Sequence, residues 1–157
     1  DRHTIEGGCA CGAVRYRMAG PPIFVHCCHC TRCQCQSGSA FALNALIETD
    51  RITLLRGETE LVLVPTPSGA GKKIARCTEC RVAVWSHYMR ATEKVAFLRV
   101  GSLDDSAAIG PDIHIFTSTK LPWVSLPEGA LAVTDFYDRN AVWPAEALAR
   151  VKAAVEG

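Results

Sequence analysis

The nine cysteines are the residues of this sequence whose type and spacing point most clearly to chemistry. Seven of them fall into three short motifs: Cys9-x-Cys11, Cys28-x-Cys30-x-x-Cys33 and Cys77-x-x-Cys80. Thiols two or three residues apart can converge on one metal ion, whereas such near neighbours form a disulfide only with strain. A chain of 157 residues, 48% of them apolar, also does not need the disulfides that stabilise small secreted domains. The spacing therefore predicts metal binding.

The number of thiols in the motifs suits two zinc ions of different kinds. A structural zinc is usually closed by four protein ligands, whereas a catalytic zinc keeps three and leaves a fourth position for water or substrate. Cys9 and Cys11 can project from one side of an extended segment, and residues 77–80 can form a turn, so Cys77 and Cys80 would complete a four-thiolate structural site. A local cup with an open position, the predicted catalytic zinc site, would be formed by the remaining three: Cys28, Cys30 and Cys33.

A second assignment of the same cysteines is open at this point. Cys30-x-x-Cys33 and Cys77-x-x-Cys80 could pair as a zinc ribbon, a pattern typical of binding modules. It would leave three motif cysteines without a role. An open zinc with three thiolates, by contrast, can accept a fourth soft sulfur ligand from a small-molecule thiol.

Several residues near the motifs have both a structural and a chemical interpretation. Cys27 and Cys35 are either small, buried, apolar residues that pack in the core, or spare metal ligands or redox thiols. His29 either points away from the proposed ligands beside it or moves protons, and His114 is either a hydrogen-bonded strand residue or a substrate-site group. Three cations are either ordinary solvated charges or bind the carboxylates of a ligand: Arg32, Lys72 and Lys73. Core or pocket-wall packing is expected for Phe41 and Trp123.

Alternating apolar residues predict that strands position the motifs. Such alternation is found at Val14, Tyr16 and Met18, and again over 41–47. Residues 52–55 and 60–64 predict a hairpin with Gly57 near its turn. Further strands are predicted at 72–76, 82–85, 95–100 and 113–119.

Helices are predicted in only two places, after Cys30 and over 145–155, where Pro144 can occupy the first turn. We therefore expect one zinc-binding domain over 1–157. It would be mainly β, with antiparallel sheets joined at a metal-rich end and a C-terminal helix packed outside.

Composition argues against several classes of partner. With 17 Lys and Arg against 16 Asp and Glu, the net charge is +1, which provides no large field for a nucleic acid or an anionic membrane. The longest nearly apolar stretch, 40–47, is far shorter than the roughly 18 to 20 residues that span a bilayer. We expect neither nucleic acid nor membrane as a partner, and we make no prediction of oligomeric state.

Taken in order, the motifs resemble the glutathione-dependent formaldehyde-activating enzyme family. The resemblance begins with Gly8-Cys9-Ala10-Cys11-Gly12-Ala13-Val14 and continues with Cys28-His29-Cys30-Thr31-Arg32-Cys33, Ser37-Gly38, Phe41 and Cys77-Thr78-Glu79-Cys80. Later blocks of the family are similar to Gly101-Ser102-Leu103-Asp104-Asp105, Pro111, His114-Ile115 and Lys120-Leu121-Pro122-Trp123. The resemblance spans about residues 7–123 and leaves 124–157 as a C-terminal extension with a helix.

The resemblance implies a zinc-anchored β-tent fold with a structural zinc on the CxC and CxxC cysteines and a second zinc on the CxCxxC cysteines. It implies the joining of formaldehyde to glutathione, which gives S-hydroxymethylglutathione and is formally a carbon–sulfur lyase reaction in reverse. The family usually has an aromatic residue before the CxxC and Gly after it, where this chain has Arg76 and Arg81. Since Gly at such a turn often serves a positive φ, Arg81 is expected to be strained or the turn to differ.

These inferences predict a cytoplasmic zinc enzyme. Its zinc on Cys28, Cys30 and Cys33 would bind the thiol of glutathione or a relative, lower the pKa of that thiol and position it for addition to a small carbonyl such as formaldehyde. The alternative is a non-enzymatic, zinc-stabilised domain that binds a protein partner.

Overall fold

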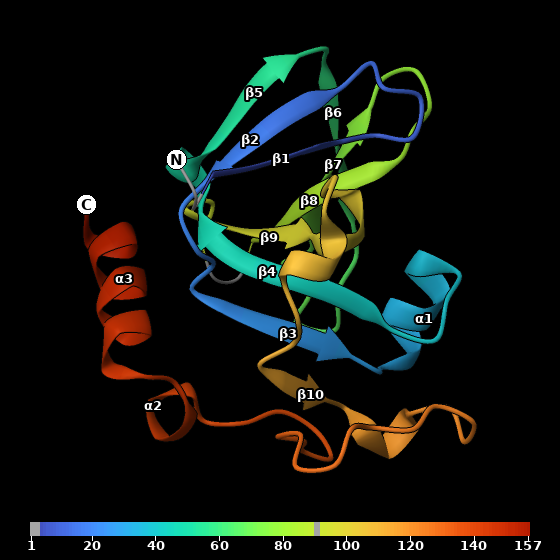
Figure 1. Ribbon diagram of the computed structural model, residues 1–157, viewed down its shortest axis with the longest axis vertical. Coiled ribbons are helices and arrows are strands. Elements are labelled where there is room, and N and C mark those ends of the chain that lie inside the picture. Colours follow the sequence, from blue (N-terminus) through green and yellow to red (C-terminus); the bar gives the residue numbers. More distant parts are fainter. Residues whose placement is uncertain (1–3, 90–91) are drawn as a thin grey trace.

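The computed structural model describes residues 4–89 and 92–157, which form two β-sheets and three α-helices (Figure 1). The smaller sheet has the strand order β1 (Thr4–Gly8), β2 (Arg15–Ala19), β5 (Ile52–Arg56). The larger sheet has the order β10 (Ile113–Ile115), β3 (Phe24–Cys28), β4 (Ala42–Glu48), β9 (Val95–Arg99), β8 (Ala83–Tyr88), β7 (Lys72–Cys77), β6 (Thr59–Val64). The helices are α1 (Thr31–Ser37), α2 (Arg139–Val142) and α3 (Ala145–Glu156). The mainly β fold class is confirmed.

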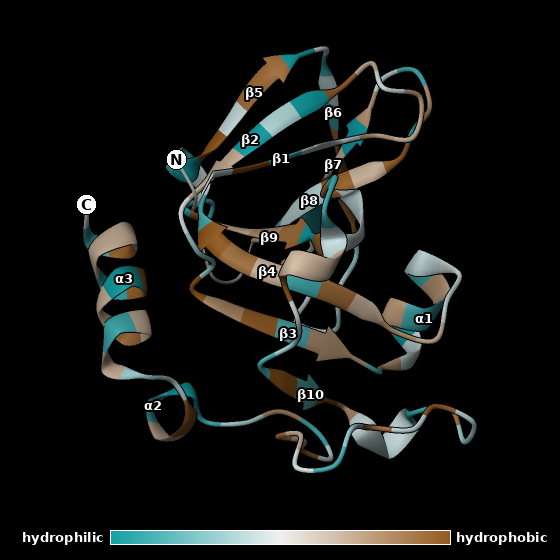
Figure 2. Cartoon of the chain, in the orientation of Figure 1, coloured by the Kyte–Doolittle hydropathy of each residue, from teal (hydrophilic) through white to brown (hydrophobic). Residues whose placement is uncertain are grey.

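One face of the larger sheet packs against the smaller sheet and forms the main core. Val14, Tyr16 and Met18 are completely buried there, as their alternation predicts. They pack with side chains of the larger sheet that include Val25, Ala45, Ile47, Ala75 and Leu98. The hydrophobic residues along β3, β4 and β9 are visible in Figure 2.

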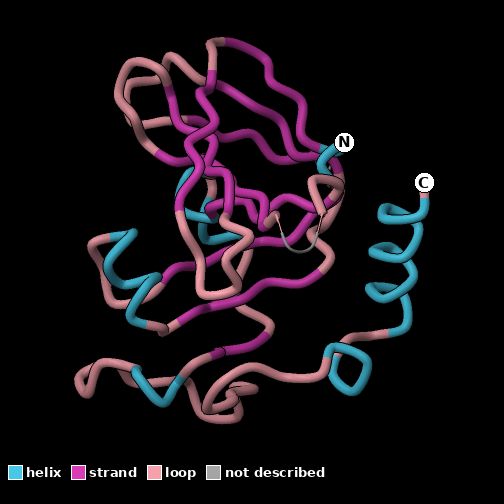
Figure 3. Tube along the Cα trace, turned by 180° about the vertical axis from the view of Figure 1, so that it is seen from behind, coloured by secondary structure: helices cyan, strands magenta, loops and turns pink. Residues whose placement is uncertain are grey.

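The opposite face of the larger sheet is covered in part by the C-terminal segment. Trp143, Ala147 and Val151 are buried against Phe24 and Leu46, and α3 contacts β4 and β9. An ion pair fixes the helix further, with Nε and Nη2 of Arg150 at 3.0 and 2.6 Å from the two carboxylate oxygens of Glu48. The predicted C-terminal helix is thus confirmed, and α3 stands at the edge of the molecule in Figure 3.

The hairpin predicted over 52–64 is wrong. Both strands exist, but β5 pairs with β2 in the smaller sheet and β6 pairs with β7 in the larger one. Gly57 between them has a φ of 83°, and a Cβ there would lie 2.3 Å from the carbonyl oxygen of Ala13. The chain therefore passes closely over the β1–β2 turn as it crosses from one sheet to the other.

Further differences concern the later part of the chain. The strand predicted over 113–119 ends at Ile115, runs parallel to β3 rather than antiparallel, and is followed by a 3₁₀ turn over Thr117–Thr119. The four-residue helix α2 was not predicted. Trp123 is 73% exposed, which contradicts the expectation that it lies in the core or a pocket wall. Among the described residues, no helix is long and apolar enough to cross a membrane.

Candidate functional site

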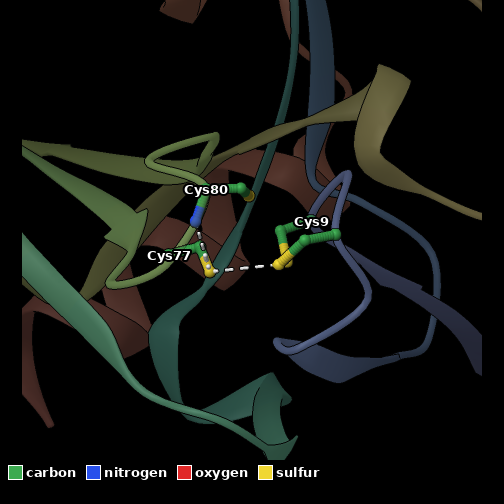
Figure 4. A group of neighbouring side chains, drawn as sticks. Cys9, Cys77 and Cys80 are labelled. Carbon is green, nitrogen blue, oxygen red and sulfur yellow. Dashed lines mark hydrogen bonds between the residues drawn. The ribbon is translucent and has the colours of Figure 1, made fainter.

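Four cysteines from two distant turns bring their sulfurs together. Cys9 and Cys11 follow β1, Cys77 ends β7, and Cys80 lies in the turn before β8; all four sulfurs lie within 4.8 Å of one another. Figure 4 shows Cys9 reaching toward Cys77 and Cys80 from the other side. We call these residues the four-sulfur cluster. It joins the two sheets.

The four-sulfur cluster has the donor set and the dimensions of a closed zinc site. Zn–S bonds of about 2.3 Å in a tetrahedron place sulfurs ~3.8 Å apart. Here Cys11 Sγ lies 3.5 Å from Cys9 Sγ and 3.8 Å from Cys77 Sγ. Backbone N–H groups of Val14 and Glu79 donate to the sulfurs of Cys9 and Cys77 at 3.2 and 3.3 Å, and although burial raises the pKa of Cys9, the bond from Val14 lowers it.

A second group, Cys28, Cys30 and Cys33, also has its sulfurs within 4.8 Å of one another, and we call it the three-sulfur cluster. Cys28 ends β3 and Cys30 is the N-cap of α1, where its sulfur accepts a hydrogen bond from Cys33 N at 3.3 Å. The first helical turn therefore brings Cys33 back beside Cys30. Since the structure places Cys30 and Cys77 in separate clusters, the zinc-ribbon assignment is wrong.

The three-sulfur cluster favours negative charge. Hydrogen bonding from the Cys28 thiol, opposed by burial, lowers the pKa of Cys33 to about 6, and the same bond raises the pKa of Cys28. The positive charges of Lys72 and Arg99 lower the pKa of Cys33 further. One thiolate is thus stabilised before any ligand or metal adds to the group.

A cavity of about 780 Å³ adjoins the three-sulfur cluster and is lined by all three of its cysteines. Its floor is one face of the larger sheet, since His26 and Cys28 on β3 alternate with residues that face the main core. Asn44, Leu46 and Phe97 continue this face on the neighbouring strands. The four-sulfur cluster, by contrast, contributes Cys11 and Cys80 only to an open surface depression.

For Lys72, the structure contradicts the interpretation as an ordinary solvated charge. Its side chain is not solvated but buried, with 3% exposure, and it lines the cavity. Its Nζ lies 3.5 Å from Tyr88 Oη, and it forms no ion pair with a carboxylate in the described part of the chain. Burial, together with the charge of Arg99, lowers the pKa of Lys72 to about 8. This ammonium therefore remains free to interact with a bound ligand.

The other two candidate cations differ in position. Arg32 is exposed on α1, lines the cavity and donates to the carbonyl oxygen of Pro65 at 3.3 Å. Lys73 points away from this face of the strand and pairs with Glu93 at 3.0 Å. Of these three candidates, Arg32 and Lys72 can therefore reach a ligand in the cavity, and Arg139, at the start of α2, is a further cation in its lining.

His29 and His114 form a separate buried pair rather than part of the cavity wall. His29 Nε2 lies 3.0 Å from His114 Nδ1 and 3.5 Å from Cys27 Sγ, and all three residues are buried. Phe41, 38% exposed, packs on the His29 ring at 5.4 Å between centroids. The ligand atoms of Cys27, His29 and His114 lie within 4.8 Å of one another, and among the described residues His29 Nδ1 has no hydrogen-bond partner, so both the structural and the chemical interpretation of these residues stay open. Cys35 is exposed, contrary to the packing expected for it.

Sequence reasoning missed an aromatic part of the cavity. Phe136, Tyr137 and Trp143, from the C-terminal extension, line it together with Phe116. The segment from 120 to 138 has no regular helix or strand, so no periodicity marked these residues. The signal that could have found them is composition, because aromatic residues in an irregular segment of a chain with only 7% aromatics indicate a packed or binding surface.

The four-sulfur cluster joins the two sheets, and the three-sulfur cluster lies beside the cavity. The chain is therefore a mainly β protein with two cysteine groups that could each hold a metal ion. The sequence pattern of the family described as glutathione-dependent formaldehyde-activating enzyme matches residues 4–119, so the chain belongs to that family. A protein of Halomonas elongata named putative glutathione-dependent formaldehyde-activating enzyme is 27% identical over 127 residues, covering 78% of this chain and 80% of that protein. The predicted family is confirmed.

The fold is also similar to that of a solved protein. A crystal structure of a Rhodobacter sphaeroides protein, determined as a structural genomics target, superposes with a TM-score of 0.50 at 20% sequence identity. The match covers 92% of that chain but 68% of this one. The fold is thus shared, and about a third of this chain lies outside the match.

Arg81, which replaces the family's usual Gly after the CxxC, adopts the strained alternative predicted for it. Its φ is 64°, in the left-handed region that favours glycine. Its side chain forms an exposed ion pair with Glu60, and Arg76 Nη1 donates to the Arg81 carbonyl oxygen at 2.8 Å. The turn therefore keeps the shape that positions Cys77 and Cys80, at a cost in backbone energy.

We predict that Arg81→Gly is more stable than Arg81→Ala by about 1 kcal/mol in the free energy of unfolding, because both lose the ion pair but only Ala keeps a Cβ at positive φ. Urea unfolding of the two metal-loaded variants measures this difference. Equal stability, or a more stable Ala variant, would contradict a left-handed residue after the CxxC.

Proposed function

We propose that this chain is one cytoplasmic zinc-binding domain that joins the thiol of glutathione, or of a similar molecule, to a small carbonyl such as formaldehyde, in the carbon–sulfur lyase class. In this proposal the three-sulfur cluster holds a catalytic zinc and the four-sulfur cluster holds a structural one. The observation that carries it is that the three-sulfur cluster, one ligand short of a tetrahedron, adjoins the large cavity. Family membership supports the thiol and the carbonyl.

The donor set suits this chemistry. Three thiolates on a zinc ion leave one position that a fourth sulfur can occupy, and soft sulfur ligands suit zinc. When bound there, zinc supplies the Lewis acidity that lowers the pKa of a substrate thiol. The three-sulfur cluster adjoins a cavity and not a flat surface, which favours a small-molecule substrate over a protein partner.

The cavity's cations are suited to hold and protonate the reactants. Lys72 faces the three-sulfur cluster and interacts electrostatically with its thiolates, while Arg32 lies on the exposed side of the cavity and contacts Pro65. We assign Arg32 to a carboxylate of the thiol substrate. We assign Lys72 to the carbonyl oxygen, because a buried ammonium without a carboxylate partner can stabilise and protonate a developing alkoxide.

These roles give a balanced addition. The thiol releases its proton to solvent, the sulfur forms a bond to the carbonyl carbon, and the C=O π electrons move to oxygen. Lys72 Nζ donates a proton to that oxygen and is reprotonated from solvent. The product is the S-hydroxyalkyl thiol.

We predict that the two clusters differ in their effect on stability. Cys77→Ser should lower the melting temperature markedly, because the four-sulfur cluster ties two distant turns together and structural zinc sites contribute on the order of 10 kcal/mol. Cys30→Ser should stay folded and bind one zinc in place of two, since its cluster closes only a short loop. Metal analysis with thermal unfolding measures both. A Cys77→Ser protein that melts like the parent would sink the structural assignment.

The catalytic assignment is tested with cobalt in place of zinc. Glutathione should change the thiolate-to-cobalt absorption of the parent, and the parent should form S-hydroxymethylglutathione faster than the spontaneous reaction. Lys72→Met should keep the spectral change but lower the rate by about 10²-fold, the usual contribution of a proton donor. Lys73→Met is the matched control, because its neighbouring side chain lies outside the cavity and should leave the rate unchanged.

Two results would contradict these roles. An unchanged cobalt spectrum at saturating glutathione would exclude direct binding of the thiol at the three-sulfur cluster. A Lys72→Met variant that retains the parent's rate would exclude Lys72 as the proton donor and leave the metal assignment intact.

A further inference from the structure

The cavity has an aromatic wall made of four residues: Phe116, Phe136, Tyr137 and Trp143. The rings of Phe136 and Tyr137 stack at 4.6 Å between centroids, and Phe116 stacks on Phe136 at 6.2 Å. Trp143 is buried, whereas Phe136 is 57% exposed. An aromatic ring that lines a cavity and is still half exposed has apolar surface left to bury against a ligand.

The polar atoms of the wall are engaged with one another. Trp143 Nε1 donates to Tyr137 Oη at 2.7 Å, and the same hydroxyl bonds His26 Nε2. These groups are therefore satisfied within the wall, which leaves ring carbons as its remaining contact surface. Such a surface offers little to the amides and carboxylates of a peptide thiol.

The wall stands close to the three-sulfur cluster. The His26 ring contacts Phe136 and Tyr137 at 5.9 and 5.6 Å between centroids. His26 and Cys28 lie two positions apart on the same face of β3, which is about 7 Å along a strand. Phe116, Tyr137 and Trp143 also pack in the same hydrophobic cluster as Cys28 and Cys33, so an apolar group carried by a sulfur held at the three-sulfur cluster can extend toward the wall.

The backbone at the wall's start is strained. Phe116 has a φ of 55°, an uncommon conformation for an aromatic residue, and hydrogen bonds from its N–H to Asp135 O and from Thr119 N–H to its carbonyl hold it there. This conformation follows directly on Ile115, the β10 partner of Cys28. Strain of this kind persists where the surroundings impose it, and it is common at ligand sites.

Three of the four wall residues lie beyond residue 119, where the family match ends. The cysteine clusters and Phe116 lie within the match, so most of the wall comes from a part of the chain that the family pattern does not cover. Formaldehyde carries no apolar group that could use it. Arg139 packs over the Trp143 ring at 5.7 Å, whereas the other cations of the cavity, Arg32 and Lys72, come from α1 and β7 and remain available to the polar part of a thiol.

Resting on the function proposed above, we propose that the cavity also accepts an aryl or comparably large apolar group on the carbonyl carbon, so that apolar aldehydes are carbonyl substrates in addition to formaldehyde. The reaction is the same addition: the C–S bond forms, the π electrons move to oxygen, and oxygen takes a proton. The apolar group then packs on Phe136 and Tyr137.

The test compares two stable mimics of the adducts on the zinc-loaded full chain. S-benzylglutathione carries a phenyl group on the carbon bonded to sulfur, and S-methylglutathione lacks it. Calorimetry should show that the parent binds the benzyl compound at least about tenfold more tightly, the gain expected from burying one ring. Phe136→Ala should reduce this ratio by at least about threefold. Leu131→Ala, an exposed apolar residue of the same segment that does not line the cavity, should leave it unchanged.

Each outcome bears on this proposal separately from the function. A parent that binds both compounds equally, or neither, overturns the aryl subsite even if glutathione and formaldehyde react at the cluster. A benzyl preference that survives Phe136→Ala also overturns it, because the wall would then not be its source. A preference that depends on Phe136 supports the subsite even if no rate enhancement with formaldehyde is found, a result that would overturn only the proposed reaction.

Discussion

The convergence of Cys9 and Cys11 with Cys77 and Cys80 is the constraint on which the rest of this structure depends. It fixes the β1–β2 turn against the end of β7, and with it the smaller sheet against the larger one. It also fixes the register of β7, whose two faces alternate. Cys77 and Ala75 face the main core, so Lys72, at the other end of the strand, faces the cavity. A closed cluster at one end of a strand thus positions an ammonium at the other.

The same alternation separates two kinds of chemistry on β3. Cys27 points to one side, where it meets His29 in a buried group without access to the cavity, and Cys28 points to the other side, where it joins the three-sulfur cluster. A slip of one residue would exchange the two thiols. Strand β3 pairs with β4 on one side and with β10 on the other. These two pairings fix its register, so Cys27 and Cys28 keep their opposite faces.

What the sequence predicted well is local. Cysteines two or three residues apart must end near one another, and alternation over 14–18 marks a strand whatever its partner. The pairing of strands was harder to predict. The sequences of β5 and β6 resemble a hairpin, yet β5 pairs with β2 and β6 pairs with β7. Lys72 looked solvated because its burial depends on β8, α1 and the loop after β6 together. The left-handed conformation of Arg81 is one of the two alternatives expected from the sequence, because one dihedral angle is a local property.

The aromatic wall was beyond such reasoning, because contacts made by an irregular segment create it. Main-chain hydrogen bonds attach this segment to β10: His114 N to Leu131 O at 2.9 Å and Phe116 N to Asp135 O at 2.8 Å. These bonds do not involve side chains and make no contact with the cysteines. Side chains of the wall nevertheless pack with these cysteines, since Phe116, Tyr137 and Trp143 belong to the same hydrophobic cluster as Cys28 and Cys33. In the proposed function, the thiol would be held by residues of β3 and α1 and the carbonyl group would be selected by residues 116–143, so a change in the wall would also alter the packing around the three-sulfur cluster.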